Sequence, residues 1–490
     1  MTSSSATYTV SEIRNKSIKG IKWVGLAEVM IRLGQVISTI ILAKLLGPNT
    51  FGIFGICLIL YRLAHAIADF GFGAAIIQKK DIEKRQIDTI FSLCLIFSTI
   101  LCLTAYFLAD YVQHFFSFKD LTEPIKILSF IFVIVASSII LRSLFIRNLN
   151  FDKLTIIEVL SFFLSSIIAI FLAYKGFGIW SLIIGLYIEN ILLTILLFIY
   201  ANWIPHLRIS FTCLKEILPF AFNVILARLA YFFNSNIGNF LVGKFLGQHY
   251  LGIYLVAYSL IDMPVQRISK NVTKVTFSTL SKFQDDLMEF KKTYKAINYY
   301  LSLIIFPLFI GLFIVAPEFI RTFYGHQWEE MIVPLRILCF AGIFRSLLVI
   351  SSTTLFAINK PEVEVKIAFF QGFLLCTLII LFLHSGIIGV SLAVTAAYLL
   401  GSSTSLILTL STIRMRLREY IKLILNPFVG SGFIISIWLV NFFTLKNVMS
   451  DLIFMIINII ISAILFTIYV FITDRSVFSR FRKILLTSYE

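Results

Sequence analysis

The sequence predicts an all-α membrane protein with about fourteen transmembrane helices in one polytopic domain. Of its 490 residues, 59% are hydrophobic and 14% are charged, whereas soluble globular proteins carry about 25% charged residues. Apolar runs of about 20 residues or more, the length that a helix needs to cross a bilayer, recur from end to end. A motif near the start of the chain also returns about 200 residues later, which is typical of a duplicated architecture.

The first two apolar runs are separated by Gly47 and Pro48, which favour a tight turn. The first run is too long for the apolar part of a signal peptide and should remain as the first span. Short polar segments separate the later runs in the same manner. The expected spans are 21–46, 51–77, 89–110, 125–146, 155–174, 179–202, 217–246, 249–275, 293–316, 331–357, 363–384, 387–411, 425–443 and 451–472.

Basic residues predict the orientation of these spans. A net charge of +16 would favour nucleic acid as a partner of a soluble protein. Here Lys and Arg gather in alternating connections, as the positive-inside rule describes, so no nucleic-acid partner is expected. Both termini are therefore expected in the cytoplasm, with an even number of spans. The main basic segments are 14–19, 79–85, 282–292, 414–422 and 475–483.

An internal repeat predicts two similar halves. KLLG followed by FGIF at 44–54 matches KFLG followed by LGIY at 244–254, and GIWSL at 178–182 is echoed by GVSL at 389–392. Six spans per repeat give both halves the same orientation, so they should be related by a pseudo-two-fold axis along the membrane normal. The expected parts are a cytoplasmic segment 1–20, six-helix lobes 21–212 and 213–412, an extra helix pair 413–472 and a cytoplasmic tail 473–490.

The first two spans each carry a polar stripe. Lipid cannot solvate a charged stripe, so it must face other helices or water. This pattern is typical of a transporter with a polar-lined passage. The stripes are Glu28, Arg32 and Gln35 in the first span and Arg62, His65 and Asp69 in the second.

Arginines near the middle of several spans are the candidate substrate contacts. A central Arg costs roughly 2.5–3.5 kcal/mol on insertion scales, and guanidinium binds phosphate in a bidentate manner. The alternative is internal pairing, of Glu28 with Arg32, of Arg62 with a neighbouring acid and of Arg228 with Asp262. The full candidate set is Arg32, Arg62, Arg228, Arg345, Asp262, Glu28, Tyr231 and Tyr258.

Other charged residues are candidates for coupling or gating. Asp69 and Glu189 are candidate sites for a coupling proton or sodium ion, with a salt bridge as the alternative. Arg142, Glu158 and Arg267 lie nearer the predicted cytoplasmic face, where they would gate the passage or contact a headgroup; snorkelling to the interface is the alternative.

Enzyme motifs are absent from the sequence. The histidines and cysteines have no metal-ligand spacing, and no Gly-rich phosphate loop is followed by Lys. The connections between spans are too short for a catalytic domain. We therefore expect no enzymatic activity, no metal and no cofactor apart from a coupling ion, H⁺ or Na⁺.

Several short motifs resemble one family in their order and spacing. LAKLLGP at 42–48, FG at 51–52, DFG at 69–71, AIIQ at 75–78, GFGIWSL at 176–182 and AINK at 357–360 are such motifs. Over about residues 17–415 the chain resembles the polysaccharide and O-antigen flippases of the multidrug/oligosaccharidyl-lipid/polysaccharide (MOP) exporter superfamily. It departs from their pattern at Ser278, in place of a proline, and at Asn236 or Asn239, in place of an acid.

The resemblance implies two six-helix lobes that work by alternating access in a bacterial inner membrane. The cargo would be an undecaprenyl-diphosphate-linked oligosaccharide, moved from the cytoplasmic to the outer leaflet for surface polysaccharide synthesis. Implied partners are this lipid-linked sugar, the bilayer, and the polymerase and chain-length machinery. One alternative is a multidrug exporter of the same superfamily, which would require a passage lined mainly by acidic residues to bind cationic drugs. The other is a membrane polymerase or glycosyltransferase, which would need a long outer loop with a catalytic group.

Overall fold

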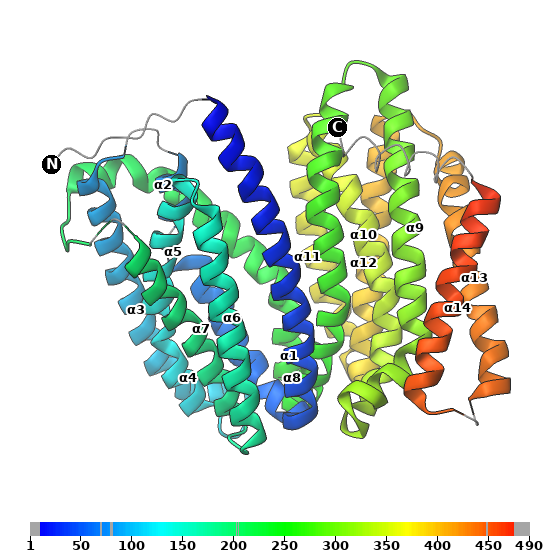
Figure 1. Cartoon of the computed structure of the whole chain (residues 1–490), viewed down its shortest axis with the longest axis horizontal. Helices are drawn as coiled ribbons and strands as arrows, with labels where there is room; N and C mark the ends of the chain where they lie inside the picture. The colour runs from blue at the N-terminus through cyan, green and yellow to red at the C-terminus, as the bar shows by residue number, and fades with distance from the viewer. Residues whose placement is uncertain are drawn as a thin grey trace. The chain divides into compact units, whose positions relative to one another are not determined.

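The computed structural model describes residues 10–68, 71–78, 82–201, 203, 205–446 and 449–474. These residues form α-helices joined by short turns, with no strand among them (Figure 1). The chain divides into two compact units, Met1–Gly252 and Ile253–Glu490. The all-α class predicted from the sequence is confirmed.

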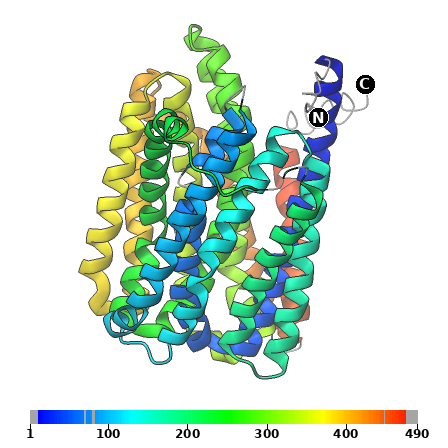
Figure 2. The ribbon, with the colours of Figure 1, turned by 90° about the vertical axis from the view of Figure 1, so that its left-hand side faces the viewer.

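Unit 1 contains the helices from the N-terminus to the middle of α8. Of these, α3 and α5 to α7 run roughly parallel to one another, blue to green in Figures 1 and 2. The elements are α1 (Val10–Ile67), α2 (Phe72–Gln78), α3 (Lys84–Phe116), α4 (Thr122–Ser129), α5 (Ile131–Arg147), α6 (Phe151–Tyr174), α7 (Ile179–Tyr200) and the first part of α8 (Phe211–Lys282).

Unit 2 contains the remainder of α8 and all later helices. A π-helical turn, Ile320–Tyr324, and a 3₁₀ turn, His326–Met331, connect α9 to α10. The helices are α9 (Leu287–Phe319), α10 (Ile332–Ala357), α11 (Pro361–Phe382), α12 (Gly386–Thr412), α13 (Leu417–Leu445) and α14 (Asp451–Thr473).

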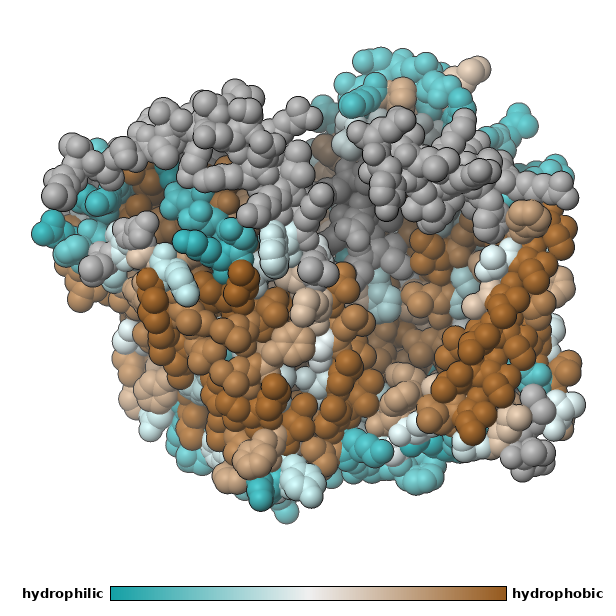
Figure 3. All heavy atoms as spheres, viewed as in Figure 1, coloured by the Kyte–Doolittle hydropathy of each residue, from teal (hydrophilic) through white to brown (hydrophobic). Residues whose placement is uncertain are grey.

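Ten helical stretches in the described residues are long and apolar enough to cross a membrane. One of them, Trp23–Ile67, bends at Gly47, and another, Pro361–Thr412, holds both α11 and α12. Hydrophobic side chains cover the middle of the helices in each unit, and hydrophilic ones gather towards the helix ends (Figure 3). The chain is a multi-pass membrane protein; the total of fourteen spans, the two six-helix lobes and the orientation of the termini stay predictions.

The structure divides two expected spans into separate helices, although Thr122–Arg147, which holds α4 and α5, still forms one stretch long and apolar enough to cross a membrane. The run predicted at 51–77 ends as a helix at Ile67 and resumes at Phe72, directly after Gly71, whose φ of +76° no right-handed helix accommodates. The run predicted at 125–146 breaks at Phe130, whose amide donates to the carbonyl of Ile127, three residues back. This 3₁₀-type bond separates α4 from α5.

The repeat predicted from the sequence has a repeated backbone conformation. Gly47 has φ 74° and ψ 172°, and Gly247, at the matching position of the second motif, has φ 87° and ψ 178°. These left-handed values favour glycine, and each marks the sharp bend of a long helix. The second echo is shifted: Gly178 (φ 56°, ψ −131°) has its conformational counterpart in Gly386 (φ 63°, ψ −152°), three residues before the predicted Gly389.

The bends of α1 and α8 contact each other backbone to backbone within unit 1. A Cβ built on Gly52 would lie 1.7 Å from the carbonyl oxygen of Gln248, and one on Gly252 would lie 2.0 Å from that of Pro48. The two contacts are reciprocal. Gly52 of the first motif meets Gln248 of the second, and Gly252 of the second meets Pro48 of the first. This explains why the first part of α8, which the sequence assigns to the second repeat, lies in the first compact unit.

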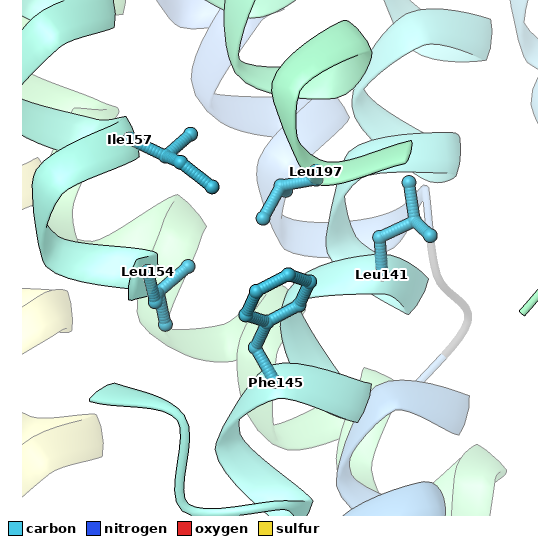
Figure 4. Close-up of a cluster of buried hydrophobic side chains, with 5 residues drawn as sticks. All are labelled: Leu141, Phe145, Leu154, Ile157 and Leu197. Carbon is cyan, nitrogen blue, oxygen red and sulfur yellow. The ribbon is translucent and has the colours of Figure 1, made fainter. Parts of the chain in front are cut away.

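Within unit 1, α5, α6 and α7 pack through an apolar cluster. It consists of Leu141, Phe145, Leu154, Ile157 and Leu197, all buried and directed towards one another (Figure 4). Other residues of α6 are apolar and exposed, as expected for a surface in contact with lipid. This packing fixes the helices that carry the polar residues of unit 1.

A strained turn after α12 gives the first testable expectation. Arg414 has a φ of +52°, and its own amide and that of Met415 donate to the carbonyls of Ser411 and Leu410, as in a Schellman motif. Because a non-glycine residue pays about 1–2 kcal/mol for this conformation, Arg414→Gly should stabilise the protein by roughly 0.5–1 kcal/mol after the entropy cost of glycine. Thermal unfolding in detergent measures this. The matched control is Arg416→Gly, at a residue with an extended backbone (φ −74°, ψ 139°), and this variant should not be more stable than wild type. An equal gain in stability from both variants would contradict strain at Arg414.

Candidate functional site

Among the described residues of unit 2, Arg345 of α10 is a charged residue inside a candidate membrane span with several polar contacts. Its Nη1 donates to the hydroxyl of Tyr258 at 2.9 Å and to the carboxylate of Asp262, both on α8. The side chains of Arg345 and Asp262 are only 19% and 25% exposed. Tyr258 and Asp262 lie one helical turn apart, so one face of α8 presents both acceptors.

Two aromatic rings flank the Arg345 guanidinium. Its central carbon lies 5.6 Å from the ring centroid of Tyr258 and 5.6 Å from that of Tyr398 on α12. The two tyrosine hydroxyls are 3.0 Å apart, and the ring of Tyr254 stacks on that of Tyr258. Gln266 donates from Nε2 to the second oxygen of Asp262 at 3.0 Å. We call Tyr258, Asp262, Gln266, Arg345 and Tyr398 the Arg345 cluster.

The Arg345 cluster is electrically neutral in this structure. The guanidinium and the Asp262 carboxylate offset each other's charge, which reduces the cost of placing both among apolar helices. Within the part of the chain that the structure describes, both hydrogen bonds of Arg345 come from Nη1. Its Nε and Nη2 groups therefore remain available as donors in the fork geometry that suits a phosphate.

In unit 1, a second predicted arginine joins α1 to α8. The Nη1 of Arg62, an exposed side chain, donates to the Oδ1 of Asn236 at 3.2 Å. Asn236 is buried and bonded to the carbonyl of Phe232 on its own helix. Arg228, partly exposed, precedes Asn236 by about two turns of α8. The structure thus places Arg62 and Arg228 in one unit.

The polar stripe predicted for the first span, in the first half of α1, pairs internally. Arg32 and Glu28 form an ion pair at 3.8 Å, with side chains 41% and 39% exposed, and Arg32 also donates to Gln35 at 2.8 Å. The pairing of Glu28 with Arg32, weighed from the sequence, is present. Such an exposed pair is worth little in stability and keeps the charges on one stripe of the helix.

The candidate gating residues of α5 and α6 contact each other. Arg142 and Glu158 form an ion pair at 2.5 Å. On α7, Glu189 is half-buried next to Asn190, whose side chain lies within hydrogen-bond distance of the Tyr61 hydroxyl. The side-chain placements of three other candidates, Asp69, Tyr231 and Arg267, lie outside the described residues.

An ion cluster that the sequence did not predict ties α9 to the connection between α13 and α14. The Nζ of Lys446 lies 2.7 Å from Glu318 and 2.7 Å from Asp451. Burial lowers the pKa of Lys446, but hydrogen bonds to the two carboxylates outweigh burial and hold the pKa above its ordinary value. The ammonium thus stays charged and holds the predicted extra helix pair to α9.

Tyr398 and Gln266 are the members of the Arg345 cluster that the candidate set missed. Tyr398 is one aromatic residue in a mostly apolar run, and it meets α8 across 140 residues of chain. Only the spacing of Gln266, one turn after Asp262, gave a local signal. No group of His, Cys, Asp and Glu in the described residues could hold a metal ion.

Comparisons with known proteins agree on one class. A family model described as "Polysaccharide biosynthesis protein" matches residues 41–333. The chain is 26% identical over 443 residues to the lipopolysaccharide biosynthesis protein WzxC of Escherichia coli (strain K12), covering 89% of this chain and 87% of WzxC. It is 26% identical over 358 residues to the teichuronic acid biosynthesis protein TuaB of Bacillus subtilis (strain 168), covering 71% of this chain and 73% of TuaB.

Solved structures share the fold. The lipid II flippase MurJ in its inward closed conformation superposes with a TM-score of 0.75 at 18% identity, covering 93% of this chain and 99% of MurJ. An inward-facing multidrug resistance MATE family transporter of the MOP superfamily gives a TM-score of 0.63 at 16% identity, covering 78% of this chain and 94% of the transporter. At these identities the similarity establishes the fold.

Proposed function

This chain belongs to the polysaccharide biosynthesis protein family and has a MOP-superfamily fold, and from that premise we propose that it is a flippase for an undecaprenyl-diphosphate-linked oligosaccharide. The cargo passes from the cytoplasmic to the outer leaflet of a bacterial inner membrane by alternating access. The relatives WzxC and TuaB are named for the biosynthesis of cell-surface polysaccharides, which supports a surface polysaccharide as the product.

The Arg345 cluster is the observation that carries this proposal. A diphosphate headgroup is anionic, and it cannot cross the apolar bilayer without a partner for its charge. Arg345 offers Nε and Nη2 to such a group at membrane depth. The rings of Tyr258 and Tyr398 supply the flat, amphipathic surfaces on which a sugar or a cationic side chain packs.

The arginines of unit 1 are proposed as further contacts for the headgroup or the sugar. Arg62 and Arg228 lie on α1 and α8, and Arg32 lies on the stripe of α1 that also holds Glu28. Three guanidinium groups within one unit favour an anionic cargo, because each can bind phosphate in a bidentate manner.

A proton or a sodium ion is the proposed coupling ion. Glu189 is half-buried on α7, and it carries no hydrogen bond or ion pair to any other described residue. A carboxylate in such a position binds a cation or a proton when the passage exposes it to water and releases the ion on the other side. Polymerase and chain-length proteins are the proposed protein partners.

Two other functions were weighed. A multidrug exporter is favoured by the likeness to the MATE family transporter, but cationic drugs call for an acid-dominated site, whereas each unit carries arginines among its polar residues, Arg345 in unit 2 and Arg62 and Arg228 in unit 1. A polymerase or glycosyltransferase would need an outer catalytic loop. The connections between the helices, such as the stretch 201–210 between α7 and α8, run to about ten residues and are too short for a catalytic domain, which supports transport over enzymatic activity.

Deleting the gene tests the proposal. We expect the lipid-linked oligosaccharide to accumulate on the inner leaflet and surface polysaccharide to disappear, with both effects reversed by the wild-type gene. Inner-leaflet orientation is measured by protection of the sugar from an impermeant oxidant in right-side-out vesicles. Normal surface polysaccharide without accumulation would contradict flipping, and increased sensitivity to cationic dyes instead would support the drug exporter.

A further inference from the structure

We propose that Asp262 is an internal counterion that competes with the cargo's phosphate for Arg345. The proposal rests on the proposed function and assigns Asp262 a positioning role: it does not bind the cargo but sets how tightly Arg345 holds it. This differs from the sequence-based expectation, in which Asp262 was one of the residues that contact the substrate.

The first observation is how the guanidinium donors are used. Asp262 and Tyr258 both accept from Nη1, and among the described residues nothing accepts from Nε or Nη2. A phosphate that binds the free edge of the guanidinium would therefore lie next to the Asp262 carboxylate. Two anionic groups on one guanidinium repel each other in a site of low dielectric constant.

The second observation is that Asp262 has another partner. Its Oδ2 accepts from Gln266 Nε2 at 3.0 Å, one turn further along α8. When a phosphate displaces the carboxylate from Arg345, Asp262 retains this hydrogen bond and is not left without a polar partner. Gln266 is exposed, so the displaced carboxylate moves towards water or headgroups rather than into packed side chains.

The third observation is the aromatic frame. Tyr258 and Tyr398 flank the guanidinium, and their hydroxyls lie 3.0 Å apart. The rings hold Arg345 in place whichever anion it faces. An exchange of Asp262 for phosphate therefore changes the partner of the guanidinium without moving the guanidinium itself.

The exchange has a physical advantage for a transporter. An unpaired arginine at membrane depth would bind a diphosphate tightly and release it slowly, whereas a built-in anion returns to the guanidinium and promotes release. It also keeps the charge paired when the protein is empty. Removing the carboxylate should thus raise affinity and lower the rate of transport.

Binding to the purified full-length protein in lipid nanodiscs tests this, with farnesyl diphosphate as the probe. Wild type should bind it, and Asp262→Asn, which keeps the shape of the side chain, should bind it about tenfold more tightly. Arg345→Gln should bind it at least about tenfold more weakly. The double variant Asp262→Asn with Arg345→Gln should match Arg345→Gln, because Asp262 acts only through Arg345.

The matched control is Asp110→Asn, which removes a different Asp from an ion pair, with Lys126 at 3.2 Å, and should bind like wild type. If Asp262→Asn binds as weakly as Arg345→Gln, Asp262 merely holds the arginine in place and the counterion role is wrong. Unchanged affinity would also overturn it, while the deletion phenotype would still support a flippase. Inorganic diphosphate and farnesol are tested as further probes, for the anionic group alone and the lipid alone. If inorganic diphosphate binds as tightly as farnesyl diphosphate, the counterion role still holds but a lipid-linked cargo is contradicted.

Discussion

Replacing Gly52 or Gly252 by alanine is expected to destabilise the protein by about 3 kcal/mol or more, at the upper end of the usual cost of overpacking. The new Cβ would lie 1.7 Å from the carbonyl oxygen of Gln248 in one variant and 2.0 Å from that of Pro48 in the other. Both obstacles are backbone atoms, so no side-chain rotation relieves the overlap, and the bends of α1 and α8 must separate.

The measurement is thermal unfolding in detergent together with complementation of surface polysaccharide in a deletion strain. Gly311→Ala is the control, since a Cβ at Gly311 meets nothing within 4 Å, and it should stay within about 0.5 kcal/mol of wild type. Because the two contacts are reciprocal, the double variant should cost less than the two single costs combined. Wild-type stability of Gly52→Ala would show that the bends tolerate separation.

Replacing Arg345 by alanine should abolish surface polysaccharide while the protein still reaches the membrane. The change removes the proposed phosphate contact and leaves Asp262 without its guanidinium partner. Removing one partner of a fully buried pair costs roughly 3–5 kcal/mol, and less is expected for this partly exposed pair, so membrane abundance has to be measured beside activity. Arg345→Lys keeps the positive charge but loses the forked donor geometry of the guanidinium. This variant should reach the membrane in normal amounts but lose most transport.

The same assay applies to Arg32, Arg62 and Arg228. Alanine at these positions should also abolish surface polysaccharide, since each is a proposed cargo contact. The control is Arg321→Ala: Arg321, in the π-helical turn after α9, is 39% exposed and paired with Glu329, and its loss should leave transport intact. If every variant at the proposed contacts restores surface polysaccharide fully, these arginines do not contribute to cargo binding.

The class of protein could be read from the sequence because it follows from hydrophobic length. Runs of lipid-spanning length with few charges leave no soluble alternative, and the structure confirms helices throughout the described residues. The family resemblance was also confirmed, by the match over residues 41–333. The motifs that carry the resemblance include Gly47 and Gly52. Gly47 has a positive φ, and Gly52 lies against backbone atoms, so each position requires glycine.

The helix boundaries near Ile67 and Phe130 could not be predicted from hydrophobic length. Hydropathy continues through both places, so a run of apolar residues conceals the break. The positive φ of Gly71, directly before the second helix, and the short-range bond of Phe130 are backbone features that a hydropathy pattern does not record.

The sequence by itself determined that this chain lies in a membrane, that two of its bends repeat, and that Arg345 and Asp262 are costly charges in need of partners. Only the tertiary structure decided that they partner each other, 83 residues apart, between the rings of Tyr258 and Tyr398. The physical reason is that helical periodicity fixes the face on which a charge lies, whereas its partner depends on which helix packs against that face. That choice is made by the packing of α8, α10 and α12.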